Sequence, residues 1–265
     1  MKTIISKDGT KIAYEVSGQG PAVVLVDGAL CYHDSGPGRE IAKLLEPYFT
    51  TYIYDRRGRG ESEDTKPYDI KREIEDLEAV IDAAGGKAFV FGQSSGAILS
   101  LEAARVIGAK IKKLAVYEAP MIVDDSRTPM GEEYRKRMEQ LIAEDRRSDA
   151  VLMFFKSVQL PGVFSFLIRL TPLWSKLKSI ANTLPYDFAI ASPYQYGKPL
   201  SKDRWNKVTM PTWVGDGDKS PTWMRNSQKA LVEVLPNAKY YTLPGQTHAV
   251  KAKSVVPELV KFFKA

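Results

Sequence analysis

Short, unbroken runs of apolar residues recur along the chain, and segments with helical periodicity separate them. Such runs lie at residues 22–26, 51–54, 88–91 and 114–117, and further strands are expected at 211–215 and 239–243. Their length and continuous apolar character are typical of parallel strands covered on both faces. Strands that alternate with helices predict an α/β fold, in which crossover helices connect a mostly parallel sheet.

The segment before the first run has the pattern of a β-hairpin. Residues 3–5 and 11–16 flank the sequence Lys7-Asp8-Gly9-Thr10. An Asp-Gly pair between two apolar runs suits a tight turn. We therefore expect an antiparallel hairpin at the N-terminal edge of the sheet.

Apolar residues three and four positions apart mark the helices. Ile70, Ile74, Leu77 and Ile81 form one apolar stripe, and the helix that carries it is expected to end at the following Gly85 and Gly86. A last helix is expected around residues 255–263.

The alternation of strands and helices stops between residues 121 and 207. Residues 134–142 have helical periodicity, and so do residues 173–180. Before the second helix, Thr171 is the expected N-cap and Pro172 belongs to the first turn. A long segment without structure is improbable in a compact protein. We therefore expect a helical cap at 121–207, inserted into an α/β core formed by 1–120 and 208–265.

Length and composition suit one globular domain, since the chain has 265 residues, of which 44% are apolar and 26% charged. No apolar run approaches the roughly twenty residues that cross a bilayer, and the N-terminus lacks a signal-like apolar core. We expect a cytoplasmic protein without a membrane partner.

The charge pattern does not indicate a nucleic-acid partner. The formal charge is +6, but the basic residues are interspersed with nearly as many acidic ones, as on solvated helix faces. Cys31 is the only cysteine and is interpreted as a small buried side chain. No phosphate-binding glycine motif and no metal-ligand spacing occur, so neither a cofactor nor a metal is expected.

Ser94 is the strongest candidate for a catalytic residue. The turn Gly92-Gln93-Ser94-Ser95-Gly96 joins the apolar run before it to a helix-forming segment at 97–104. A sharp strand-to-helix turn exposes a serine hydroxyl above the sheet, and flanking glycines allow that turn. Serine needs a base near neutral pH, and His248, between the last predicted strand and the last helix, is the candidate.

The chain resembles the α/β-hydrolase family over nearly its whole length. The resemblance runs from the hairpin through the segment Asp55-Arg56-Arg57-Gly58-Arg59-Gly60-Glu61-Ser62 to Ser94 and His248. It implies that the carboxylate that orients His248 lies three residues after a glycine. This spacing selects Asp218, which follows Gly215, and Asp216 is the alternative. It also implies that the Asp55–Ser62 segment braces a loop and does not bind phosphate.

An oxyanion hole is expected from the backbone amides of Ser95 and Ala29. Relatives usually have His-Gly where this chain has Asp27-Gly28. His33 is expected either to bind substrate or to pair with a loop carboxylate. Among the cap aromatics, Phe154 and Trp174 are candidates for lining an apolar substrate pocket.

These residues predict a serine hydrolase that cleaves a small or hydrophobic carboxylic ester, thioester or lactone through an acyl-enzyme, with a small acyl compound as its partner. Perhydrolysis, cofactor-free haloperoxidase-like chemistry, carbon–carbon hydrolysis and acyl transfer use the same triad and stay open. A different alternative is a ligand-binding receptor on a hydrolase scaffold.

Overall fold

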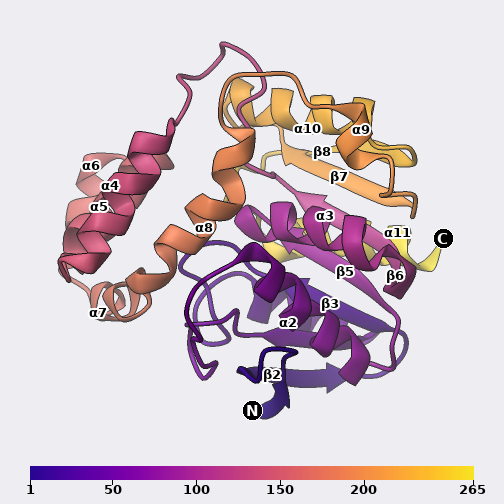
Figure 1. Ribbon diagram of the computed structural model, residues 1–265. Helices are drawn as coiled ribbons and strands as arrows, with labels where there is room; N and C mark the ends of the chain where they lie inside the picture. Colours follow the sequence, from indigo (N-terminus) through magenta and orange to yellow (C-terminus); the bar gives the residue numbers. More distant parts are fainter.

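Eight strands form one sheet at the centre of the computed structural model, which describes residues 1–265 (Figure 1). The strands in chain order are β1 (Lys2–Ile5), β2 (Lys11–Gly18), β3 (Ala22–Val26), β4 (Thr50–Tyr54), β5 (Ala88–Gln93), β6 (Ile111–Tyr117), β7 (Thr212–Gly217) and β8 (Ala238–Leu243). Their order across the sheet is β1-β2-β4-β3-β5-β6-β7-β8. The hairpin of β1 and β2 is antiparallel, β2 pairs antiparallel with β4, and the other neighbours are parallel. The predicted fold class is therefore confirmed.

Helices cover both faces of the sheet. On one face, α1 (Gly38–Leu45) and α11 (Ala252–Lys264) pack together and share an apolar cluster with side chains of β3 and β6. On the other face, α2 (Ile70–Ala83), α3 (Ser95–Ile107) and α10 (Thr222–Val234) contribute to a second cluster. The strands between them are buried on both faces, which explains their continuous apolar sequences.

Local signals account for the bounds of α2. The Asp69 carboxylate accepts a hydrogen bond from the Lys71 amide at 2.8 Å, so it caps the first turn. Ile74, Leu77 and Ile81 are buried, as the predicted stripe requires. Gly85 and Gly86 both have positive φ just after the helix, a conformation that favours glycine and ends the helix there.

Only helices lie between β6 and β7. They are α4 (Glu132–Ala143), α5 (Arg147–Ser157), α6 (Gly162–Arg169), α7 (Pro172–Ser179), α8 (Leu184–Ala191) and α9 (Lys202–Trp205), with short 3₁₀ turns between some of them. Helices α4 to α7 gather to one side of the sheet, and α8 runs from this group back to the core (Figure 1). Side chains of α4, α5, α7 and α8 form an apolar cluster of their own.

The C-terminal part of this helical segment packs against the core. Trp205 and Tyr194 belong to the same apolar cluster as the side chains of α3. Arg105 on α3 donates from Nε to the carbonyl oxygen of Arg204 at 2.7 Å, which holds α9 against the core. None of the helices is long and apolar enough to span a membrane.

Candidate active site

Ser94 lies at the turn between β5 and α3 with a strained backbone, φ 57° and ψ −127°. The two flanking glycines make this turn possible. A Cβ on Gly96 would lie 2.2 Å from the carbonyl oxygen of Val26, and one on Gly92 would lie 2.5 Å from that of Gly96. No side chain fits at either position, so the backbone around Ser94 can adopt this conformation only with glycine there.

His248 lies in the loop between β8 and α11, where its Nε2 is 3.1 Å from Ser94 Oγ. Two side chains of the central strands hold this loop. Gln93 donates to the carbonyl oxygen of His248 at 3.2 Å, and Tyr117 donates to that of Thr247 at 2.8 Å. The predicted pairing of Ser94 with His248 is therefore present.

The carboxylate that contacts His248 is Glu118, the residue that follows β6. Its Oε2 is 2.8 Å from His248 Nδ1, and its side chain is fully buried. The other oxygen, Oε1, accepts hydrogen bonds from the Gly217 amide at 2.8 Å and from the Ser220 hydroxyl. Both oxygens of the buried carboxylate therefore have partners, as a buried charge requires.

The prediction that Asp218 orients His248 is wrong. Strand β7 extends to Gly217, two residues farther than expected, which carries Asp218 beyond the sheet edge. There it is exposed and accepts a hydrogen bond from the Gly245 amide at 2.7 Å. The alternative, Asp216, is buried and bonded to Tyr240 and Arg225. Glu118 occupies the position beside His248 that was predicted for Asp218 or Asp216.

Ala29 and Ser95, whose amides are the expected oxyanion donors, lie beside Ser94 and His248 in one cavity. Ser95 is the first residue of α3, where helix amides point outward without helical partners. Gly28 lets the loop approach the nucleophile, since a Cβ there would lie 2.9 Å from Ser94 Cβ. The role of the two amides stays a prediction.

Asp27 stands where the resemblance implies histidine, and its carboxyl group is buried against the start of α1. Burial raises the pKa of Asp27 to about 7, although Arg59 and Arg56 counteract this shift and the Gly38 amide donates to the carboxyl. A Cβ on Gly38 would lie 2.3 Å from Asp27 Oδ2, so only glycine fits here.

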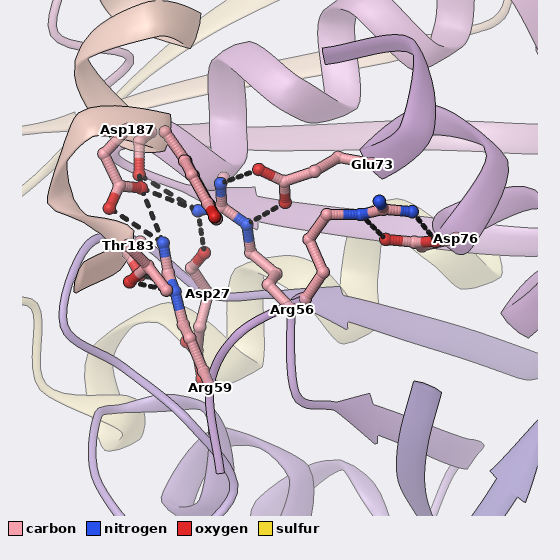
Figure 2. A network of polar contacts seen from close by, with 12 residues as sticks. Asp27, Arg56, Arg59, Glu73, Asp76, Thr183 and Asp187 are labelled. Atoms are coloured by element: carbon pink, nitrogen blue, oxygen red, sulfur yellow. Dashed lines mark hydrogen bonds and ion pairs between the residues drawn. The ribbon is translucent and has the colours of Figure 1, made fainter. Parts of the chain in front are cut away.

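A buried ion-pair network adjoins the cavity through Asp187 (Figure 2). Arg56 makes two hydrogen bonds to Glu73, at 2.6 and 2.8 Å, and one to Asp187 at 2.8 Å. Arg59 Nη2 contacts both oxygens of Asp187, at 2.9 and 2.7 Å. Burial alone would raise the pKa of Asp187, but Arg59 and Arg56 outweigh it and lower that pKa below its usual value.

This network connects helix α8 to Ser95 and to the loop after β3. Asp187 lies on α8 and accepts a hydrogen bond from the Ser95 hydroxyl at 2.7 Å. Arg59 donates to the carbonyl oxygen of Gly28 at 2.6 Å. Arg57 is likewise paired with Asp76, at 2.7 and 2.8 Å. The structural interpretation of this arginine segment is confirmed, because buried carboxylates occupy its guanidinium groups.

His33 pairs with a loop carboxylate and does not line the cavity. Its Nδ1 lies 2.7 Å from Asp55 Oδ2, and its amide donates to Asp55 Oδ1 at 2.6 Å. Substrate binding by His33 is therefore not supported, because Asp55 holds it away from the cavity. Cys31 donates from Sγ to the carbonyl oxygen of Ala29 at 3.3 Å, and burial raises the pKa of its thiol.

The cavity above Ser94 has a volume of about 110 Å³. Its apolar lining includes Pro120, Met130, Phe154, Phe188, Trp223 and Met224. The candidate Phe154 is thus at the cavity wall, and its contact with substrate stays a prediction. The candidate Trp174 is wrong, because it is buried among cap side chains beside Phe155 and beneath Arg169.

The chain is similar to known proteins in both sequence and fold. A family model described as "Alpha/beta hydrolase family" matches residues 20–251. The solved structure of an alpha/beta hydrolase from Sphaerobacter thermophilus DSM 20745 is 48% identical, covers 99% of this chain and 100% of its own, and has a TM-score of 0.90. A thermophilic esterase from Thermogutta terrifontis has the same fold, with 19% identity, a TM-score of 0.72, and coverage of 99% and 96% of the two chains.

A curated relative, the uncharacterized hydrolase YraK of Bacillus subtilis (strain 168), is 33% identical over 98 residues. The match covers 36% of this chain and spans about a third, 35%, of the relative's length.

We expect the substitution Asp187→Asn to lower the free energy of unfolding by about 3–5 kcal/mol, because it leaves two buried guanidinium groups without their shared counter-charge. Urea unfolding followed by circular dichroism measures this change. The matched control is Asp149→Asn, which alters an exposed pair with Arg146 and is expected to change stability by less than about 1 kcal/mol. Equal effects of the two substitutions would contradict this account.

Proposed function

Because the chain belongs to the alpha/beta hydrolase family, we propose that it is a serine hydrolase that cleaves a carboxylic ester, thioester or lactone of a small molecule. One observation carries the proposal, namely the continuous line of hydrogen bonds from Ser94 Oγ through the His248 ring to Glu118, with separations of 3.1 and 2.8 Å. A nucleophile, a base and a group that orients the base are the parts that such chemistry needs.

The proton transfers follow from this arrangement. The Glu118 carboxylate only accepts hydrogen bonds, so Nδ1 of His248 carries the proton and Nε2 is free to accept the proton of Ser94. Ser94 Oγ then attacks the substrate carbonyl and forms a tetrahedral intermediate. The protonated His248, stabilised by Glu118, gives its proton to the leaving alcohol or thiol, and water hydrolyses the acyl-enzyme by the same route.

The negative charge on the carbonyl oxygen requires donors that are already in place. Ser95 and Ala29, whose amides are the expected donors, both line the cavity beside Ser94. The Asp187 network supports them, because it binds the Ser95 hydroxyl and, through Arg59, the carbonyl oxygen of Gly28. One such donor contributes about 3–4 kcal/mol of transition-state stabilisation.

The cavity indicates the size of the reacting group. Its volume of about 110 Å³ suits a short acyl chain or a small ring, and apolar side chains such as Met130 and Phe154 favour burial of an aliphatic or aromatic group.

We expect the wild-type protein to hydrolyse members of a panel of short-chain 4-nitrophenyl esters, aryl thioesters and small lactones. Ser94→Ala should lower kcat/KM on the best substrate by at least roughly 10⁴-fold, because it removes the nucleophile. Release of nitrophenolate or thiol, and acid release from lactones, measure the rates. No activity above that of the Ala variant on any compound would contradict the proposal.

Substitution of Glu118 and of Asp218 tests which carboxylate orients His248. Glu118→Gln should lower kcat by roughly 10³–10⁴-fold, because a neutral amide neither fixes the tautomer of His248 nor stabilises its protonated form. Asp218→Asn is the matched control and should change kcat by less than about threefold, since Asp218 contacts only a loop amide. A larger loss in the Asp218 variant than in the Glu118 variant would reverse the assignment.

A further inference from the structure

Arg127 is a charged residue at the cavity wall whose role the proposed chemistry does not explain. It lies in the loop between β6 and α4, and it lines the same cavity as Ser94 and His248. Its guanidinium carbon lies over the ring of the buried Trp223, 4.1 Å from the centroid. Such stacking fixes the plane of the guanidinium group and leaves its edge available to a ligand.

No acidic side chain pairs with Arg127. Its hydrogen bonds all start at Nη2 and run to the Ser157 carbonyl oxygen and to Met130 Sδ, the latter at 3.7 Å, so Nε and Nη1 donate to no protein acceptor. In contrast, the other arginines buried near the site, Arg56 and Arg59, are each bonded to carboxylates. Arg127 is half-buried, and this burial lowers its pKa.

The other charged residue of the cavity does not compensate for Arg127. Asp187 also lines the cavity, but its two oxygens already accept hydrogen bonds from Arg56, Arg59 and Ser95. The cavity therefore combines apolar walls with one cation that has no counter-charge within the protein. A cation that is half-removed from water without an anion is unfavourable, and a bound anion would offset that cost.

A groove of about 1080 Å³ adjoins the cavity and shares Arg127, Met130, Ser157, Gln159 and Trp223 with it. Arg127 thus stands where the inner cavity meets the outer groove. The groove is lined by two further cations, Arg137 and Lys156, and by a single acid, Glu133. This excess of positive charge favours the approach of an anion.

We propose that Arg127 binds a carboxylate carried by the substrate, so that the substrate is an ester, thioester or lactone with a second, ionised carboxyl group remote from the scissile carbonyl. This inference rests on the proposed hydrolase function for the identity of the scissile bond. The free donors Nε and Nη1 lie on different edges of the guanidinium group, and each can donate a charge-assisted hydrogen bond to a carboxylate oxygen.

The first experiment compares 4-nitrophenyl half-esters of succinate, glutarate and adipate with alkanoate esters in which a methyl group replaces the carboxylate. The wild-type protein should have a higher kcat/KM on at least one half-ester than on its alkanoate. Arg127→Gln should lower that ratio by roughly 10-fold to 100-fold, mainly through KM, since it removes a charged hydrogen-bonded pair between protein and substrate. Arg127→Lys keeps the charge but loses the planar group that stacks on Trp223, and its ratio should lie in between.

The control variant is Arg169→Gln, which removes the same charge from an exposed position on the cap, at the end of α6. It should keep the ratio of half-ester to alkanoate within about threefold of the wild-type ratio, because screened surface charges act weakly over distance. If Arg127→Gln and Arg169→Gln lowered the ratio of half-ester to alkanoate equally, the effect would be one of net charge and the proposal would be overturned.

A binding experiment separates this inference from the proposed hydrolysis. Calorimetry with monoethyl glutarate and the Ser94→Ala protein should detect binding, and the double variant with Arg127→Gln should bind at least roughly 10-fold more weakly. If no ester is turned over but this binding depends on Arg127, the hydrolase proposal fails and the carboxylate site stands. If alkanoates are hydrolysed but neither the ratio nor the binding depends on Arg127, the carboxylate site is overturned alone.

Discussion

The geometry of the site depends on a buried pairing of Asp187 with Arg56 and Arg59. These charges come from two parts of the chain, the helix α8 of the segment between β6 and β7 and the loop after β4. Buried charges are tolerated only when they are paired and fully hydrogen-bonded, so each partner requires the others. Because Asp187 also binds Ser95 and Arg59 also binds the carbonyl oxygen of Gly28, the same constraint positions the residues around the expected oxyanion donors.

The position of the acid follows from the geometry of the sheet. The carboxyl ends of parallel strands meet at one edge, and β6 is the direct neighbour of β5, which leads to Ser94. A carboxylate that follows β6 therefore reaches the same histidine as one that follows β7. Glu118 has a positive φ of 49°, and its amide donates a hydrogen bond to the carbonyl oxygen of Gly215. This bond holds the backbone at the end of β6 against β7, at the residue whose side chain contacts His248.

The sequence predicts the strand and the turn that position the site better than it predicts the hydrogen bonds of the polar side chains. The strand at 22–26, the turn at Ser94 and the pairing with His248 follow from local patterns and from chain order, and the structure has all three. Glu118 was missed because a spacing rule taken from the family pointed to Asp218, although the position of Glu118 directly after an apolar run was a usable signal. Helices α5, α6 and α8 and the buried position of Trp174 depend on tertiary packing, which periodicity along the chain does not reveal.

We propose that Ser94 is a nucleophile activated by His248. Labelling with a fluorophosphonate tests it most directly, because the reagent traps an activated serine whatever the natural substrate is. We expect one adduct per chain, mapped by mass spectrometry to Ser94, with a labelling rate that falls by at least roughly 100-fold in the His248→Asn variant. An adduct on another residue, or a rate that does not depend on His248, would contradict it.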